Sequence, residues 1–232
     1  MFDNFFEKFC NAFIDNEGYK KMFEGLGNTL LIALIALFIG IAAGSLAALA
    51  KVVQSKNPLA RVFRVIADIY ITVIRGTPVM VQLMLAYFGI ATAARFDNAL
   101  VVAIIVFGLN SGAYVAEIIR SGILAVDSGQ MEAGRSLGLS YGSTMKMIVF
   151  PQAIKNILPA LGNELIVLIK ETSVAGFITV FDMTRAARAI VADTYEAFVP
   201  YLVLAAVYLV IVMIASVFIN MLERRLRKSD HR

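Results

Sequence analysis

The sequence predicts an all-α membrane protein with five transmembrane helices, with its N-terminus outside the cell and its C-terminus in the cytoplasm. The first observation is composition: of 232 residues, 59% are hydrophobic and only 16% are charged. Soluble domains are about 45–50% apolar and about 25% charged. The second observation is that the apolar residues gather into runs of about 20, the length that a helix needs to cross a bilayer. The third is an uneven distribution of basic residues between these runs.

Five apolar runs give the expected spans. They cover residues 27–50, 69–94, 98–116, 156–181 and 197–222. The second run is interrupted by Arg75, and the fourth is the weakest because it contains Glu164, Lys170 and Glu171. Charged side chains at membrane depth are costly and usually face a cavity or a partner. The fourth run is therefore expected both to span the membrane and to carry functional residues.

The orientation follows from the Lys and Arg residues outside the runs. Thirteen lie in one alternate set of connecting segments and six in the other. The richer set is expected in the cytoplasm. It consists of residues 51–68, 117–155 and 223–232. This divides the chain into an extracytoplasmic or interfacial segment 1–26, a transmembrane part 27–222 containing the cytoplasmic segment 117–155, and a cytoplasmic basic tail 223–232.

Residue types exclude several kinds of chemistry. Cys10 is the single cysteine and His231 the single histidine, so a disulfide framework within the chain and a cysteine metal cluster are excluded, and no metal site is expected. No aspartate lies inside an expected span. An intramembrane enzyme would need paired Asp, a Ser/His set or metal ligands there, so it is disfavoured. A phosphate-binding G-x-x-x-x-G-K-[ST] loop is also absent from the sequence, so ATP is not bound by that route.

Small residues recur in the first run at four-residue spacing, at Gly40, Gly44 and Ala48. Such residues let two helices approach closely. The favoured interpretation is packing within this chain, and the alternative is a contact with a second subunit.

The segment between the third and fourth runs carries helix signals of its own. Asp127 can cap a short helix over residues 131–137, which Gly138 ends, and Ser140 can cap a second helix running toward Val149. Pro151 follows. Spacing alone leaves two interpretations open, a structured connector or a docking surface at which a glycine lets a partner approach the backbone.

This segment resembles a known motif. Glu132-Ala133-Gly134, Gly138, Ile148 and Phe150-Pro151 match the spacing of the cytoplasmic "EAA" motif, E-A-A-x3-G-x9-I-x-L-P, found in permease subunits of bacterial ATP-binding-cassette importers. Gly134 and Phe150 depart mildly from it. Segments 75–78, 110–117, 151–153 and 170–173 also look like polar amino-acid permeases of the histidine, arginine and glutamine uptake type. The resemblance covers roughly residues 25–225.

The resemblance implies a type I importer permease fold in the bacterial cytoplasmic membrane. It implies two permease subunits, identical or related, that form the translocation path, and a solute-binding protein that delivers an amino acid. Separate ATPase subunits would bind the ATP and Mg, and no cofactor is expected in this chain. Nucleic acid is not an expected partner, whereas membrane lipid is. The residues expected to dock on the ATPase are Glu132, Ala133, Gly134, Arg135, Ser136, Leu137, Gly138 and Leu139.

An amino acid is a zwitterion, so its pocket needs an acceptor for the ammonium and donors for the carboxylate. Glu164 and the Thr77 hydroxyl can accept, and Asn110 can do both. Pro78 frees the carbonyl of Ile74, which could add an acceptor. The expected substrate-binding residues are Glu164, Asn110, Thr77, Arg75, Pro78 and Asn163. Glu164 also suits a cationic substrate side chain, and the alternative for it is a structural ion pair with Arg75.

One alternative function remains, a self-sufficient secondary carrier driven by an ion gradient. Many such carriers contain an inverted internal repeat. The sequence shows no repeat, and five spans do not divide into equal halves.

Overall fold

Ten α-helices build the described part of the chain, which in this computed structural model comprises residues 2–52 and 57–227. No strand occurs in these ranges. The long helices are α2 (Gly18–Val52), α3 (Pro58–Arg75), α5 (Ala99–Leu124), α8 (Phe150–Glu171) and α10 (Phe198–Arg227). The shorter ones are α1 (Phe2–Cys10), α4 (Val79–Met84), α6 (Ser128–Ser136), α7 (Tyr141–Thr144) and α9 (Met183–Thr194).

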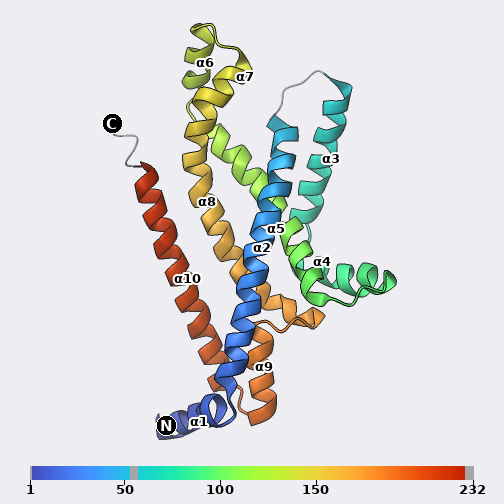
Figure 1. Ribbon diagram of the computed structural model, residues 1–232, viewed down its shortest axis with the longest axis vertical. Coiled ribbons are helices and arrows are strands. Elements are labelled where there is room, and N and C mark those ends of the chain that lie inside the picture. Colours follow the sequence, from blue (N-terminus) through green and yellow to red (C-terminus); the bar gives the residue numbers. More distant parts are fainter. Residues whose placement is uncertain (1, 53–56, 228–232) are drawn as a thin grey trace.

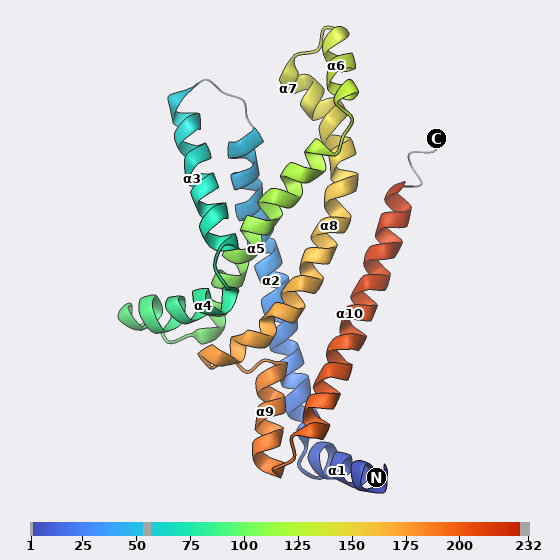
Figure 2. The ribbon, with the colours of Figure 1, turned by 180° about the vertical axis from the view of Figure 1, so that it is seen from behind.

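The molecule is elongated, with α2 and α10 running along most of its length (Figures 1 and 2). Helices α1 and α9 lie at one end. Helices α6 and α7 lie at the opposite end, where α10 also finishes. The connector that resembles the EAA motif is therefore at the same end as the start of the expected basic tail. Residues 228–232 of that tail, including His231, lie outside the described residues.

The centre of the fold is the crossing of α2 and α5. A Cβ added at Gly40 would lie 2.8 Å from Ser111 Oγ, and one at Gly44 would lie 2.7 Å from the Gly112 carbonyl oxygen. Glycine also allows close packing on the α5 side of the crossing, since a Cβ at Gly108 would lie 2.7 Å from the Ile39 side chain on α2. Packing within the chain, the favoured interpretation of the small residues in the first run, is thus confirmed.

The second apolar run is not one straight helix. Helix α3 begins at Pro58, ends at Arg75 and is followed by α4, which continues as a π-helix over Leu85–Ala91; the two parts are bent by 103°. Pro78 has no N–H to bond to the Ile74 carbonyl, and its ring clashes with the preceding turn. The expected single span over residues 69–94 is therefore wrong in both its start and its shape. Because of this bend, α4 projects sideways from the middle of the molecule (Figure 2).

By length and composition, three described helices can cross a membrane. They are Gly18–Lys51, Ala99–Leu124 and Phe198–Leu226, and the bent pair α3–α4 would make a fourth. Helix α8 does not qualify, because charged and amide side chains interrupt its apolar sequence. Five spans are thus not established by these criteria. Expected boundaries were also too short: α2 starts at Gly18, α5 continues to Leu124, and α10 continues through its basic residues to Arg227.

The connector between α5 and α8 is shorter and more continuous than expected. Helix α7 passes through a π-helical turn, Met145–Val149, directly into α8. Pro151 was expected to follow the end of the second short helix, but it lies in the first turn of α8. Because the helix is continuous there, Pro151 removes one helical hydrogen bond, and the π-helical turn lies directly before it. The connector is therefore mechanically joined to α8.

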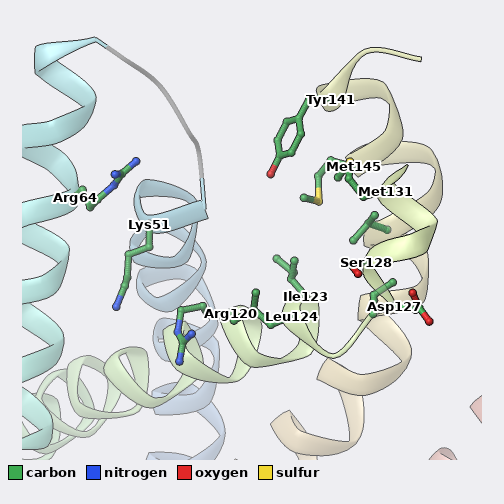
Figure 3. A pocket seen from close by; sticks show the side chains of 12 residues that line it. Lys51, Arg64, Arg120, Ile123, Leu124, Asp127, Ser128, Met131, Tyr141 and Met145 are labelled. Carbon is green, nitrogen blue, oxygen red and sulfur yellow. The ribbon is translucent and has the colours of Figure 1, made fainter. Parts of the chain in front are cut away.

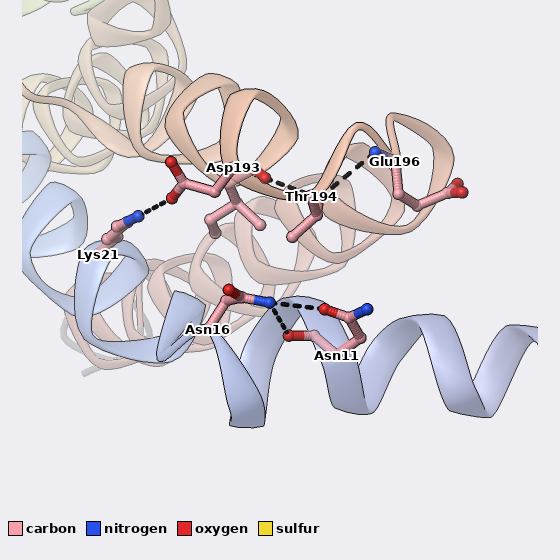
Figure 4. Close-up of polar contacts among 7 residues, drawn as sticks. Asn11, Asn16, Lys21, Asp193, Thr194 and Glu196 are labelled. Atoms are coloured by element: carbon pink, nitrogen blue, oxygen red, sulfur yellow. Dashed lines mark hydrogen bonds and ion pairs between the residues drawn. The ribbon is translucent and has the colours of Figure 1, made fainter.

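Helix α9 was not expected, since residues 182–196 were interpreted as a connecting segment. Asp182 caps this helix by accepting hydrogen bonds from the backbone N–H groups of Thr184 and Arg185. An ion pair between Lys21 and Asp193 joins α9 to α2, close to the corner where Asn16 bonds back to Asn11 (Figure 4). Residues 182–196 at this end of the molecule thus form a helix joined to α2 rather than a simple connecting segment.

Candidate functional site

Gln82 holds together the polar groups at the break between α3 and α4. Its Nε2 donates to the Ile74 carbonyl oxygen at 2.8 Å and to Thr77 Oγ1 at 2.8 Å. Its Oε1 accepts a hydrogen bond from Asn110 Nδ2 on α5 at 3.0 Å. The carbonyl that Pro78 frees is therefore occupied by a side chain of the same segment. It was expected as a further acceptor for a substrate, and in this conformation it already accepts one hydrogen bond from Gln82.

Glu164 lies on α8 and faces α5. It is 8% exposed, and its Oε1 accepts a hydrogen bond from Ser111 Oγ at 2.8 Å. The alternative partner, Arg75, makes no ion pair with Glu164 in the described part of the chain. The Arg75 guanidinium instead lies over the ring of Tyr114, 5.1 Å from its centroid. The structural ion pair considered for Glu164 is thus wrong, because a hydroxyl from α5 takes that place.

Arg75, Asn163 and Glu164 nevertheless share one cavity. It has a volume of about 410 Å³ and is open to the exterior between α3, α5 and α8. Tyr114, Glu117 and Arg120 also contribute to its walls. Acidic, basic and amide groups therefore converge on a space of the size that small-molecule sites have.

The expected site residues thus fall into two groups. Arg75, Asn163 and Glu164 line the cavity. Thr77, Pro78 and Asn110 lie at the helix break, where Thr77 Oγ1 donates to the Val73 carbonyl and Asn110 bonds to Gln82. Sequence reasoning missed Gln82 and Ser111. Gln82 carried a usable signal, since it is an amide four residues after the helix-breaking proline.

A network of ion pairs closes the cavity at one side. Lys51 at the end of α2 contacts Glu117 at 3.0 Å and Asp68 at 3.1 Å, and Arg120 contacts Glu117 at 2.8 Å. These pairs tie α2, α3 and α5 together near the end of the molecule that carries the connector. A hydrogen bond from the Tyr70 hydroxyl on α3 to the Leu109 carbonyl oxygen on α5 adds a further polar contact between these helices.

The expected docking segment forms an exposed turn. Gly138 has φ +86°, and the N–H groups of Gly138 and Leu139 bond to the carbonyls of Arg135 and Gly134. This pattern closes helices with a left-handed residue, which glycine adopts without strain. A Cβ at Gly138 would meet nothing within 4 Å, and the Leu137 side chain is 83% exposed. The turn therefore presents an accessible apolar side chain next to accessible backbone.

Gly134 does not belong to this exposed surface. It is buried, and a Cβ there would lie 2.5 Å from Thr144 Cγ2 on α7. The other expected docking residues are exposed, apart from Leu139, which is half-buried. The absence of a side chain at Gly134 therefore lets α6 pack against α7. The expectation that Gly134 contacts a partner is wrong in this structure, because α7 covers it. The caps expected at Asp127 and Ser140 are confirmed by their bonds to the N–H groups of Gly129 and Ser143.

Comparison with known proteins assigns the family. The model of the "binding-protein-dependent transport system inner membrane component" family matches residues 36–228. The chain belongs to this family. Its relatives include the arginine transport system permease protein ArtQ of Bacillus subtilis, 41% identical over 89% of this chain and 93% of the relative. The nopaline transport system permease protein NocM of Agrobacterium fabrum is 36% identical over 89% and 88% of the two chains.

Solved structures give the same fold. A crystal structure of an amino acid ABC transporter with histidines matches with a TM-score of 0.85 and 42% identity, over 92% of this chain and 98% of the other. The methionine transporter MetNI in an inward-facing conformation matches with a TM-score of 0.74 at 16% identity, over 88% and 95%. The second likeness concerns the fold alone. The type I importer permease fold implied by the resemblance is thus confirmed.

Proposed function

We propose that this chain is the membrane-spanning permease subunit of an ATP-binding-cassette importer that carries polar amino acids. The observation that carries the proposal is the family match over residues 36–228. The relatives named for arginine and nopaline transport support an amino-acid substrate. The chain would work in the bacterial cytoplasmic membrane as one of two permease subunits, identical or related, supplied by a solute-binding protein and driven by ATPase subunits that bind ATP and Mg.

Five crossings fit this function, with α2, the bent pair α3–α4, α5, α8 and α10 as the spans. The charged residues of α8 would then face the cavity rather than lipid, which is where such residues are tolerated. The N-terminus would lie outside and the connector 125–149 inside, as the basic residues favour. Five spans are too few to enclose a path alone, so a second subunit would complete it.

Glu164 is the favoured contact for the positive group of the substrate. It is buried on α8, it borders the open cavity, and the described structure gives it a neutral hydroxyl partner rather than a cation. A carboxylate that is not ion-paired and lies in a poorly solvated place attracts a positive ligand strongly. Arg75 and Asn163 on the same cavity could bind the substrate carboxylate. Thr77, Pro78 and Asn110 would shape the wall through Gln82.

The test is uptake by vesicles that contain the complete transporter. With Glu164→Gln, uptake of labelled arginine, lysine or histidine should fall by about tenfold or more, since one buried charged hydrogen bond is worth about 1.5–3 kcal/mol. The matched control is Glu24→Gln, which changes an exposed acidic residue near the start of α2. It should leave uptake unchanged. Undiminished uptake of all three amino acids by Glu164→Gln would remove this residue from substrate recognition.

The exposed turn 132–139 is the favoured contact with the ATPase. Because α7 continues into α8 through the π-helical turn, a push on the turn would reach Glu164 along one helix. This continuity supports a coupling role beyond that of a connector. Closure of the ATPase could thereby change the cavity without a flexible joint between them.

Docking is tested with Ala133→Trp, which places a bulky side chain on the exposed side of α6. ATPase copurification and ATP-driven uptake should both be lost. Gly138→Asn is the control for the turn itself, because asparagine tolerates a left-handed backbone. The same vesicles distinguish the alternative of a secondary carrier: uptake that follows an ion gradient without ATP would overturn the importer proposal.

A further inference from the structure

A second pocket, which shares Arg120 with the cavity beside Glu164, lies at the end of the molecule that carries the connector. Its volume is about 460 Å³. One wall carries Lys51 of α2, Arg64 of α3 and Arg120 of α5 (Figure 3). The facing wall belongs to the connector, where the Tyr141 hydroxyl points into the space (Figure 3). Three cationic side chains from three helices therefore line one side of the pocket, although their charged ends point in different directions (Figure 3).

The carboxylates near these cations do not fill the pocket. Glu117 and Asp68 contact Lys51, and Glu117 contacts Arg120, but neither carboxylate belongs to the lining. Of the described residues that form the lining, Asp127 alone is acidic. Its carboxylate is engaged in capping α6, where Oδ1 accepts from the Gly129 N–H. The described lining thus carries three cationic residues against one acidic residue, and two of these cations also contact carboxylates outside the lining.

An apolar groove adjoins the pocket. It has a volume of about 360 Å³ and is formed by α2, α5, α8 and the π-helical turn. Ile123 and Met145 line both hollows, so the groove and the pocket share a wall. Leu49 of α2 and Leu158 of α8 line the groove and are exposed to the exterior. The combined space is cationic at one end and apolar along the other.

We propose that the pocket and groove together bind one anionic glycerophospholipid. The phosphate would lie among Lys51, Arg64 and Arg120, and an acyl chain would lie along the groove. Basic pockets between membrane helices on the cytoplasmic side are suited to anionic headgroups. A free phosphate ion would leave the groove without an occupant. A zwitterionic lipid would bring its ammonium group against the same cations. The assignment to the inner leaflet rests on the orientation proposed above, whereas binding itself does not.

The site also lies between two separate parts of the chain. One wall belongs to the ends of α2, α3 and α5, and the other to the connector proposed to dock on the ATPase. A lipid bound between them would hold these walls at a fixed separation. Its loss would loosen the connector. Arg120, which lines both this pocket and the cavity beside Glu164, is the one residue that the two described linings share.

The experiment measures lipid binding to the full-length chain, purified in detergent and stripped of lipid, by native mass spectrometry. Phosphatidylglycerol should bind, and phosphatidylcholine with the same acyl chains should bind at least about fivefold more weakly. The pair Arg64→Gln and Arg120→Gln should weaken phosphatidylglycerol binding by about 25-fold, about fivefold for each cation. Arg61→Gln is the matched control: it lies one turn earlier on α3, is exposed and does not line the pocket. Phosphatidylglycerol should bind to the Arg61→Gln variant as it does to the wild type.

A second arm separates lipid from free phosphate and guards against misfolded variants. Leu158→Trp fills the groove and leaves every cation in place, so it should weaken binding of phosphatidylglycerol and not of inorganic phosphate. Circular dichroism should show native helix content in each variant; if Arg120→Gln unfolds, Arg64→Gln and Leu158→Trp decide. Equal binding of both lipids, an equal loss with Arg61→Gln, or displacement of the lipid by inorganic phosphate with no effect of Leu158→Trp would overturn the proposal. Because the isolated chain is used, failure of the transport proposal leaves this result unaffected.

Discussion

Replacing Gln82 with alanine should destabilise the fold at the break between α3 and α4. The change leaves the Ile74 carbonyl without its 2.8 Å donor and the Asn110 amide without its 3.0 Å acceptor. A hydrogen bond between membrane helices contributes about 0.6 kcal/mol on average and up to about 1.7. Two lost bonds therefore lower the free energy of unfolding by about 1–3 kcal/mol.

The assay is unfolding in mixed micelles, followed by circular dichroism, for the wild type and for Gln82→Ala, Asn110→Ala and the double variant. Coupling between the two positions should be about 0.6–1.7 kcal/mol, because the first substitution removes the partner of the second. Gln130→Ala, an exposed glutamine on α6, should change stability by less than about 0.5 kcal/mol. Strict additivity of Gln82→Ala and Asn110→Ala would refute the inference that Gln82 joins the break to α5.

Three further outcomes are expected. Leu137→Ala should weaken ATPase binding by about tenfold or more, since burying a leucine contributes about 1.5–3 kcal/mol; unchanged affinity in a titration with the purified ATPase would exclude Leu137 from the interface. Gly44→Leu should cost about 3 kcal/mol or more, because its side chain meets the α5 backbone, whereas Gly27→Leu, with nothing within 4 Å, should fold normally by thermal unfolding. Protection of the α1 amides against hydrogen exchange, corrected for the intrinsic pH dependence of exchange, should fall in acid below the ordinary glutamate pKa of 4.5 in the wild type but not in Glu196→Gln, because Lys8 lowers the pKa of Glu196.

The sign of this pH effect follows from the direction of the shift. The hydrogen bond from Lys8 favours the charged carboxylate of Glu196 in the folded protein. Its contribution is therefore present above the ordinary pKa of a glutamate, 4.5, and is lost as the pH falls through the lower folded pKa. Protection factors in α1 that are equal at neutral and acid pH would show that the ion pair does not hold this helix.

Local features of the connector could be predicted because they depend on neighbouring residues. Asp127 and Ser140 cap their helices through hydrogen bonds to backbone N–H groups only two or three positions further along the chain. The left-handed turn at Gly138 likewise depends on the absence of one side chain. The predicted end of the second short helix before Pro151 was wrong. A proline ends a helix in many contexts, but here it is accommodated in the first turn of α8.

Contacts across the fold could not be predicted in the same way. Ser111 and Glu164 are 53 positions apart, and Gln82 and Asn110 are 28 apart. The hydropathy pattern contains no term that pairs such residues, so Arg75 was an equally reasonable partner for Glu164. The burial of Gly134 was missed for the same reason, because it depends on how α6 packs on α7.

The sequence by itself determined that this is a helical membrane protein, where its apolar helices lie, and which exposed turn carries the permease motif. These properties follow from composition, from the length of a bilayer crossing and from bonds within one helical turn. Tertiary structure alone decided that the second run bends by 103°, that Gln82 occupies the carbonyl freed at that bend, and that Glu164 bonds to a serine. These depend on which helix faces meet, and many distant side chains fix that choice together.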